Sequence, residues 1–307
     1  MPICVMNLAF RKSDNPNRRN INRMNSLNSL KSILKSLGLR SIALKAVHMY
    51  AKIFPQQLVN RNGINYALDL NQLVDFGTFI GGWEPATIKF LNKSIMRGDT
   101  VIEVGANVGA HTLLIGNLIG NNGHIYAFEP TDFASRKLEK NISLNPSLNN
   151  ITVRNELVTN GESDLPKLDI RSSWTVDGKN APEYTSLRNL KSISIDEFSV
   201  EASLKNLMLI KIDVDGYDYK VLQGAKSTIA QFLPIIFCEL CEYTLNEQGD
   251  SIKDIYHLLS NMGYITYLED GSKINDVDSI LRLVGDKTSV NGVFIHNTKI
   301  DECGWLN

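Results

Sequence analysis

The chain has 307 residues, of which 43% are hydrophobic and 21% charged, so it can bury a sizeable core without a stabilising disulfide or metal. Its four cysteines are too few for a disulfide framework, no apolar run is long enough to cross a bilayer, and the apolar N-terminal stretch precedes the basic residues instead of following them. These features argue against a secreted or membrane-spanning protein and favour the cytoplasm.

Charge is unevenly spread along the chain. Residues 1–60 contain ten Lys or Arg against Asp14 alone, a net of +9, so the remainder carries −10 of the total of −1. One interpretation is a basic arm for an anionic partner, either a membrane surface or nucleic acid. We favour the other, a solvated leader with a helix that packs on the main domain. We therefore expect a leader and helical extension over residues 1–58 and a main domain over 59–307.

The elements follow in order along the chain. Apolar spacing predicts helix from residue 26 to about 54, ending before Pro55, and a hairpin over 58–75 that turns at Asn62-Gly63. A further helix begins after Gly81-Gly82-Trp83-Glu84-Pro85. Beyond it, helices over 132–144, 217–231 and 252–262 alternate with apolar strands, and we place seven strands at 100–104, 124–128, 151–154, 207–212, 234–240, 264–268 and 293–296.

This alternation predicts an α/β fold with a doubly wound, mostly parallel sheet. The last two strands have no convincing helix between them, so one should run antiparallel at or beside the sheet edge. Ligands of such sheets bind beyond the carboxyl ends of the strands. Candidate functional residues should therefore follow directly after strands.

The first of these strands carries the most specific signal. Glu103 stands near its end, the turn after it is bracketed by Gly105 and Gly109, and an apolar helix begins near His111. Such a turn brings backbone and a helix N-terminus close to a nucleotide-like ligand. A carboxylate there suits the positively charged amino group and sulfonium of S-adenosylmethionine and opposes a pyrophosphate. The spacing is G-x-x-x-G and not G-x-G-x-x-G, which also disfavours a nicotinamide cofactor.

A second acid supports the same ligand. Glu129 ends the next strand, slightly more than 20 residues after the first glycine, where an acid binds ribose hydroxyls in a strand–turn–helix–strand unit. Together with the strand context, Glu103 and Glu129 favour S-adenosylmethionine over NAD.

Three more acids follow later strands. Asp213 and Asp215 come after the fourth strand, and Glu239 ends the fifth. If they converge near the transferring methyl group, a carboxylate can take the acceptor proton as the methyl moves. We place Asp213 first as this base, then Asp215, with His111 as a further candidate because its unperturbed pKa lies near neutrality. Alternatively, Asp213, Asp215 and Glu239 could bind Mg²⁺ or Ca²⁺, bind substrate hydroxyls or cap helices.

Three other features have structural explanations or remain open. Residues 160–192, which include Trp174 and Tyr184, are irregular and could form a lid or substrate loop. Asp196 lies in a capping-box pattern, so we assign it to a helix start. The Cys238-x-x-Cys241 pair has no second pair with it, so we expect buried packing and not a metal or redox site.

Several segments, in the same order, make the chain similar to the FkbM-type methyltransferases: GGWEP at 81–85, GDTVIEVGANVGAHTLLI at 98–115, YAFEP at 126–130, LEKNISLN at 138–145, SIDEF at 194–198 and LIKIDVDGYDYKVLQGA at 209–225. The resemblance covers about residues 60–297. It implies the class I methyltransferase (Rossmann-like) fold and methyl transfer from S-adenosylmethionine, usually to a hydroxyl oxygen. The family pattern usually reads KIDVEG, whereas this chain has Asp215 in place of that glutamate, which could alter the preferred acceptor.

The resemblance and the residues together give a predicted site. The cofactor would lie against Gly105, Ala106, Asn107 and Gly109, with Glu103 near its amino group and Glu129 and the adjoining Pro130 near its ribose. Family resemblance adds Glu84 to this pocket, and Asp213 borders both the cofactor and the acceptor.

The acceptor is the least determined part of the prediction. Family tendency favours a sugar hydroxyl in a surface glycan or its precursor, with no nucleic acid involved. A polyketide, peptide or other secondary-metabolite hydroxyl is the alternative within the same enzyme class. RNA methylation, with the basic leader as its electrostatic footprint, and a non-catalytic cofactor-binding subunit are less favoured, and a dehydrogenase is least favoured because Glu103 would face a pyrophosphate.

Overall fold

The computed structural model describes residues 40–161, 169–171, 175–176, 184–186, 190–286 and 288–306, with side chains from Val47 onward except those of 169–171 and 184–186. The chain divides into two compact units, Met1–Leu70 and Asn71–Asn307. The expected boundary after residue 58 stays a prediction, because a division by packing does not test which segment belongs to the functional domain.

The described part of the first unit is a helix followed by a hairpin. Helix α2 (Arg40–Ile53) ends before Pro55, as predicted, and strands β1 (Gln56–Arg61) and β2 (Ile64–Asp69) pair antiparallel. Their two-residue turn places Asn62 at φ 51° and Gly63 at φ 86°. Left-handed conformations at both positions match the twist of a tight hairpin, which explains the Asn-Gly pair. The predicted hairpin and its turn are confirmed.

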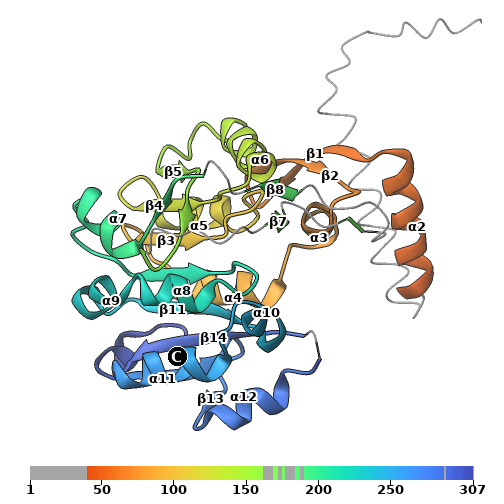
Figure 1. Cartoon of the computed structure of the whole chain (residues 1–307). Coiled ribbons are helices and arrows are strands. Elements are labelled where there is room, and N and C mark those ends of the chain that lie inside the picture. Colours follow the sequence, from red (N-terminus) through yellow and green to blue (C-terminus); the bar gives the residue numbers. More distant parts are fainter. Residues whose placement is uncertain are drawn as a thin grey trace, which may run out of the picture. The chain divides into compact units, whose positions relative to one another are not determined.

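The second unit is built on an eight-stranded sheet with the order β13-β12-β14-β11-β10-β3-β4-β5. Strand β14 is antiparallel to β11 and to β12, and β10, β3, β4, β5 and β11 are parallel. Figure 1 shows the sheet running from β5 at one edge to the blue strands near the C-terminus. The strand bounds are β3 Thr100–Val104, β4 His124–Phe128, β5 Ile151–Arg154, β10 Leu209–Ile212, β11 Ile235–Leu240, β12 Tyr264–Leu268, β13 Lys273–Ile274 and β14 Val290–His296.

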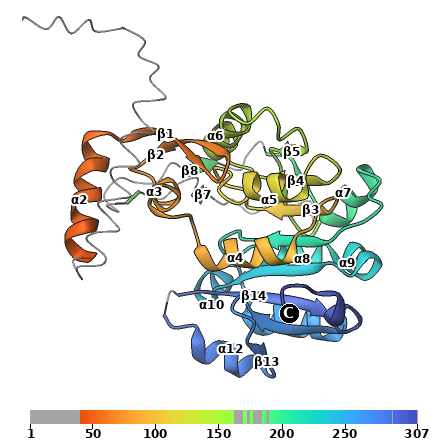
Figure 2. The same ribbon diagram turned by 180° about the vertical axis from the view of Figure 1, so that it is seen from behind.

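Helices cover both faces of this sheet, which confirms the doubly wound α/β class. One face packs against α4 (Pro85–Ser94) and α5 (Thr112–Ile119) through side chains such as Phe90, Ile115 and Phe237. These two helices come forward in Figure 2. The other face packs against helices that include α7 (Ile195–Glu201), α8 (Asp218–Gln223), α9 (Lys226–Phe232) and α11 (Ile252–Asn261). The remaining helices are α3 Leu73–Ile80, α6 Asp132–Ser143, α10 Glu242–Glu247, α12 Val277–Leu283 and the 3₁₀ helix Asn297–Glu302.

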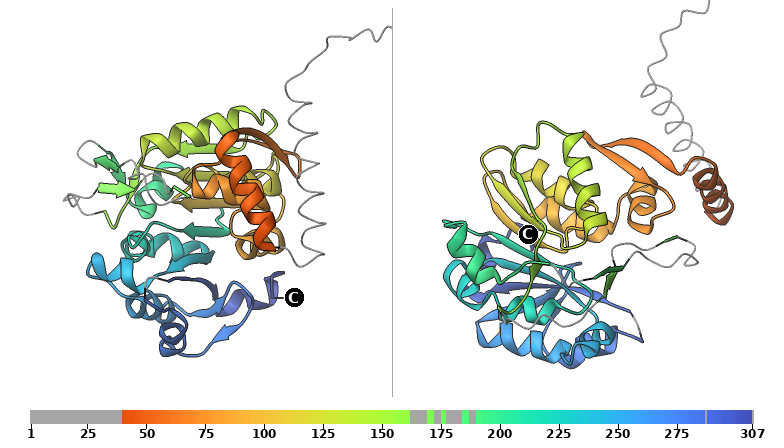
Figure 3. Two further views of the ribbon diagram at one scale, coloured as in Figure 1. Left: turned by 90° about the vertical axis from the view of Figure 1, so that its right-hand side faces the viewer. Right: turned by 45° about the horizontal axis from the view of Figure 1, so that its top comes forward.

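The end of the chain returns to the α4 side. Trp305 packs edge-on against Phe90, with ring centroids 5.2 Å apart. Figure 3 shows the C-terminus beside the blue strands. In the part of the chain that the structure describes, no helix has both the length and the apolar character to cross a membrane.

The segment over 160–192 is only partly described. Strands β7 (Asp169–Arg171) and β8 (Tyr184–Ser186) form a small antiparallel pair, and β6 (Leu157–Val158) pairs parallel with β9 (Ser192–Ile193). Trp174 and most of the expected lid lie outside the described residues, so a lid function stays a prediction.

Three element predictions need correction. Helix α12 lies between β12 and β14, the last two predicted strands, where no convincing helix was expected, although β14 is antiparallel as predicted. The sheet has eight strands and not seven, because β13 adds two residues to the edge beside β12. A two-residue strand is too short to leave a periodic pattern in the sequence. The helix predicted over 217–231 is two helices, α8 and α9, separated at Gly224. Gly224 lies against the backbone of Thr159 and Asn160, an approach that leaves no room for a side chain.

Candidate active site

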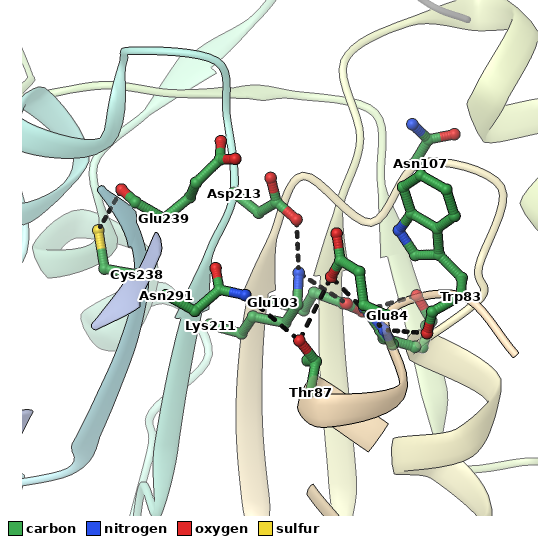
Figure 4. Close-up of polar contacts among 12 residues, drawn as sticks. Trp83, Glu84, Thr87, Glu103, Asn107, Lys211, Asp213, Cys238, Glu239 and Asn291 are labelled. Carbon is green, nitrogen blue, oxygen red and sulfur yellow. Dashed lines mark hydrogen bonds and ion pairs between the residues drawn. The ribbon is translucent and has the colours of Figure 1, made fainter. Parts of the chain in front are cut away.

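Strands β4, β3, β10 and β11 are parallel neighbours, so their carboxyl ends lie side by side. We call this side of the sheet the edge of the site. Strand register pairs Glu103 with Lys211, and Lys211 with Phe237, so β3, β10 and β11 are level with one another. Beyond these positions lie Asp213 after β10 and Glu239 near the end of β11, while Glu129 follows β4. In Figure 4 the carboxylates of Glu84, Asp213 and Glu239 point to the same side of this edge. The structure therefore gathers the predicted acids at one location.

The turn after β3 needs small side chains and a left-handed backbone conformation at particular positions. Gly105 has φ 87°, and a Cβ at this position would overlap the backbone carbonyl of Asp213. Asn107 is left-handed at φ 49°, and its side-chain oxygen accepts a hydrogen bond of 2.8 Å from the Val108 amide. Gly109 packs against Leu138 of α6. This closely packed backbone forms a cradle at the strand edge, in which Ala106 is buried.

Glu129 is held by the same turn and by its own. Its Oε2 accepts a hydrogen bond of 2.8 Å from the Asn107 amide, and its Oε1 accepts from the amide (2.9 Å) and hydroxyl (2.5 Å) of Thr131. Burial raises the pKa of Glu129, and these donors act in the opposite direction. A carboxylate oxygen has about two acceptor positions, so Oε2 has capacity for one further donor. Pro130 lies between these residues.

Glu103 is almost fully enclosed. Its exposed fraction is 1%, and its Oε2 accepts a hydrogen bond of 2.6 Å from the hydroxyl of Thr112, the first residue of α5. Burial is the main reason why its pKa is raised to about 7, and the nearby Lys211 opposes that rise. The carboxylate therefore connects β3 to the start of α5.

Lys211 and Asp213 form an ion pair at the edge. Lys211 Nζ lies 3.2 Å from Asp213 Oδ2 and 3.8 Å from Glu103 Oε1. Burial alone would lower the pKa of Lys211, but the carboxylates of Asp213, Glu103 and Glu84 outweigh burial and raise it. The Asp213 side chain is 34% exposed, so this carboxylate is paired on one side and accessible on the other.

Glu84 and His111 lie beside this pair, at the starts of α4 and α5. Glu84 adopts a left-handed conformation at φ 49°, and burial and then the negative charge of Asp213 raise its pKa. His111 Nε2 lies 3.4 Å from the Trp83 carbonyl and 3.9 Å from Glu84 Oε2. Burial, followed by the charge of Lys211, lowers the pKa of His111 to about 3, so the imidazole is neutral at pH 7.

Glu239 and Asp215 are placed differently from Asp213. Glu239 Oε1 accepts a hydrogen bond of 2.6 Å from the Ser289 hydroxyl, and burial and then Asp213 raise its pKa to about 8. Asp215 is exposed, with φ 48° in the turn after β10. Within the described ranges, no group of three or more His, Cys, Asp or Glu side chains is arranged to hold a metal ion. The described side chains of Asp213, Asp215 and Glu239 therefore do not form the possible cation site.

The structure adds residues that the sequence analysis missed. Asp218 is buried, its Oδ2 accepts a hydrogen bond of 3.0 Å from the Gly216 amide, and its Oδ1 lies 3.9 Å from the Cys238 sulfur. Asn291 of β14 donates to Glu269 Oε2 (3.0 Å), which also accepts from Thr87 (3.1 Å). The Asn291, Glu269 and Thr87 side chains are far apart in sequence, and Asp218 is enclosed by the assembled sheet, so no local pattern signals them. Cys238 and Cys241 are both buried free thiols, as expected for packing residues.

A mostly parallel sheet in which β14 runs antiparallel between β11 and β12, an acid near the end of the central strand β3 before a glycine turn, and a second acid after β4 define a class I methyltransferase fold. The profile of the family described as "Methyltransferase FkbM domain" matches residues 103–266, more than half of the chain. The chain belongs to this family, which confirms the resemblance, and residues 103–266 form its methyltransferase domain.

Individual proteins similar to this chain share 30% sequence identity or less with it. A protein-L-isoaspartate O-methyltransferase of Ignicoccus hospitalis is 30% identical over 155 residues, which cover 48% of this chain and 65% of that protein, less than two thirds of its length. Hexuronic acid methyltransferase AglP of Haloferax volcanii is 24% identical, over 58% of this chain and 68% of its own. The crystal structure of a methyltransferase FkbM from Methylobacillus flagellatus KT is 14% identical with a TM-score of 0.40, covering 64% of this chain and 43% of that one.

Proposed function

We propose that this enzyme transfers the methyl group of S-adenosylmethionine to a hydroxyl oxygen of a sugar in a surface glycan or its precursor. The observation that carries the proposal is the Asp213 carboxylate, which is paired with Lys211 on one side and accessible on the other, directly beside the cradle at Gly105. A base next to a cofactor cradle is the arrangement that methylation of a hydroxyl requires.

The chain offers a cofactor site that fits this role. When bound, S-adenosylmethionine supplies an electrophilic methyl group on a positively charged sulfur. The backbone from Gly105 to Gly109 would lie against the methionine part, and Oε2 of Glu129 would accept a hydrogen bond from a ribose hydroxyl. Because Glu103 is 1% exposed, we assign its charge to a supporting role through Thr112 and Lys211 and not to direct contact with the amino group.

Asp213 is the best-placed base. As the new carbon–oxygen bond forms and the carbon–sulfur bond breaks, the acceptor proton would pass to the Asp213 carboxylate while the bonding electron pair stays on sulfur. His111 is less suited, because it is buried and its Nε2 faces the Trp83 carbonyl, whereas the Asp213 side chain is 34% exposed. Asp215 is exposed in the same turn and would contact the acceptor, and Glu84 would border both molecules.

A sugar acceptor is supported by chemistry and by one relative. Carboxylates and amides such as Asp213, Glu239 and Asn291 line this edge and suit the several hydroxyl donors of a sugar ring. The Haloferax volcanii relative is described as a hexuronic acid methyltransferase, which supports the same acceptor class.

The first test is a calorimetric titration with S-adenosylmethionine and with NAD. We expect a micromolar affinity for S-adenosylmethionine, about −8 kcal/mol, and no heat with NAD. Glu129→Ala should bind S-adenosylmethionine about tenfold to a hundredfold more weakly, because a hydrogen bond to a charged acceptor contributes about 1.5–3 kcal/mol. Glu129→Gln is the matched control, since it keeps one acceptor oxygen and should lose less.

The second test is a methyl-transfer screen with four acceptors: a neutral hexoside, a hexuronic acid, an isoaspartyl peptide and a structured RNA. We expect product with a sugar. Transfer to the peptide or RNA alone would contradict the proposed acceptor while leaving the methyltransferase assignment intact. Absence of any S-adenosylmethionine binding would contradict the proposed cofactor site itself.

A further inference from the structure

Lys211 occupies an unusual position for a lysine. It lies on the face of β10 that packs against α4 and α5, between the buried Leu209 and the site residue Asp213, and its exposed fraction is 1%. Its sheet neighbours are Glu103 on one side and the core residue Phe237 on the other. A charge taken this far from water requires close partners of opposite charge.

The partners of Lys211 belong to two different parts of the site. Nζ lies 3.2 Å from Asp213 Oδ2 on the acceptor side and 3.8 Å from Glu103 Oε1 on the cofactor side (Figure 4). The ionisable groups that face it are Glu103 from β3, Glu84 at the start of α4, His111 at the start of α5 and Asp213 from its own chain segment. Among these, Asp213 is the nearest and alone forms a hydrogen bond with Nζ.

We infer that Lys211 is a positioning residue that holds the Asp213 carboxylate directed at the acceptor through their ion pair, without touching the acceptor itself. This inference rests on the proposed role of Asp213 as the base. A lysine at the end of a buried strand has few alternative positions, so the ion pair fixes one carboxylate oxygen and leaves the other accessible. The same ammonium also neutralises Glu103, and it thereby links the cofactor side of the site to the acceptor side.

A purely structural role would be limited to balancing the buried Glu103. The two roles differ in what they predict for methyl transfer. If Lys211 only balances Glu103, its loss should weaken folding or cofactor binding and leave the pH dependence of turnover unchanged. If it positions Asp213, its loss should reduce turnover and change the pH dependence of turnover, because the charge that lies 3.2 Å from the proposed base is then missing.

The test compares full-length Lys211→Met, Lys211→Arg and Thr112→Val in steady-state methyl transfer across pH. For Lys211→Met we expect kcat to fall about tenfold to a hundredfold and the ascending limb of the pH profile to move to higher pH, with little change in the KM for acceptor. Lys211→Arg should restore much of the wild-type profile. Thr112→Val removes the hydrogen bond that Glu103 accepts from the Thr112 hydroxyl, and it should leave the ascending limb unchanged. An unchanged pH profile in Lys211→Met would overturn the inference.

Two further variants keep the test decisive. If Lys211→Met does not fold, Glu103→Gln/Lys211→Met removes both buried charges together, which proteins often tolerate better than one unpaired charge. This double variant should bind S-adenosylmethionine and still show the shifted profile, and a wild-type profile would again overturn the inference. Asp213→Asn separates the two proposals: full activity would remove the proposed base, whereas an inactive Asp213→Asn beside a normal Lys211→Met would contradict only the positioning role.

Discussion

Gly105 is the residue where the chain after β3 comes closest to the chain after β10. Its φ of 87° is one that side chains rarely adopt, and a Cβ would overlap the Asp213 carbonyl. We predict that Gly105→Ala lowers the free energy of unfolding by about 2–5 kcal/mol, since left-handed backbone costs about 1–2 kcal/mol and overpacking about 1–3 kcal/mol. Urea denaturation measures this loss, and S-adenosylmethionine titration shows whether any folded fraction still binds.

Gly271 is the matched control for this change. It has a similar φ of 95°, but no atom lies within 4 Å of the position that a Cβ would occupy. Gly271→Ala therefore measures the backbone cost alone, and we expect about 1 kcal/mol and unaltered cofactor binding. Equal losses in the two variants would show that the contact with Asp213 is not what requires glycine at position 105.

Asp218 makes a separate prediction about pH. Burial, and then the negative charge of Asp213, raise its pKa from 3.8 to about 7. The folded protein then holds a proton that the unfolded chain releases, so this contribution to stability is present at low pH and is lost as pH rises from about 4 to about 7. The free energy of unfolding of Asp218→Asn should therefore rise relative to that of wild type as pH increases from 5 to 8. The slope should be about 1.4 kcal/mol per pH unit below the folded-state pKa, a total of a few kcal/mol.

The measurement is denaturant unfolding of both proteins at several pH values. The informative quantity is how the difference in unfolding free energy between the two proteins varies with pH. Its absolute value also contains the altered contact with Cys238. Glu302→Gln, at a side chain 73% exposed, is the surface control and should show no such change. A difference between Asp218→Asn and wild type that does not vary with pH would mean that Asp218 is charged in the folded protein.

At the scale of elements, Asp196 joins two helices. It lies in α7, whose start has the predicted capping box, with Ser194 accepting from the Glu197 amide and Glu197 accepting from the Ser194 amide. The Asp196 carboxylate accepts hydrogen bonds from the amides of Ser227 (3.0 Å) and Thr228 (2.7 Å), in the first turn of α9. The residue is therefore structural, as the sequence analysis assumed, but it caps a different helix from its own.

We predict that Asp196→Ala lowers the free energy of unfolding by about 0.5–2 kcal/mol, the usual cost of losing a helix cap. Affinity for S-adenosylmethionine should not change, because neither hydrogen bond involves the strand ends that form the site. Thermal or urea unfolding with and without cofactor measures both quantities, and Asp196→Asn should retain most of the stability. A large loss of cofactor affinity in a folded Asp196→Ala protein would contradict this structural assignment.

The elements that were predicted correctly are those with local signals. The apolar run at 100–104, the Asn62-Gly63 turn and the Ser194 to Glu197 capping pair each depend on neighbours within a few residues. The acids at the ends of strands followed from them, because parallel strands in a doubly wound sheet end at one edge. This is why the sequence alone predicts that Glu103, Glu129 and Asp213 lie close together.

The features that were not predicted depend on long-range contacts. Strand β13 is defined only by its pairing with β12, and the break between α8 and α9 by the backbone of a distant segment. The pairing of Lys211 with Glu103 requires the register of β3 with β10. The sequence shows a lysine in an apolar strand, and its surroundings appear only when the sheet is assembled.

At the scale of the whole molecule, the charge distribution distinguishes two acceptor classes. Residues 1–25 contain five Lys or Arg and one acid, whereas the sequence after residue 60 is net negative. An RNA substrate would have to be bound mainly through the basic segment, since the described edge of the sheet presents Glu84, Asp213 and Glu239. A sugar acceptor needs hydrogen-bond acceptors at that edge and no basic segment.

We therefore predict that deleting residues 1–25 changes kcat/KM for a neutral hexoside by less than about threefold, because basic residues contribute no charge attraction to binding an uncharged ring. The measurement is methyl transfer by both proteins at about 50 and 200 mM salt. If nucleic acid were the acceptor, its affinity for the full-length protein would fall steeply with salt. The slope of log affinity against log salt concentration would be about −0.9 for each phosphate contacted, and the deletion would make this slope shallower. Substituting the five basic residues with Gln at full length separates charge from length, and a salt-dependent loss in that variant would contradict a sugar acceptor.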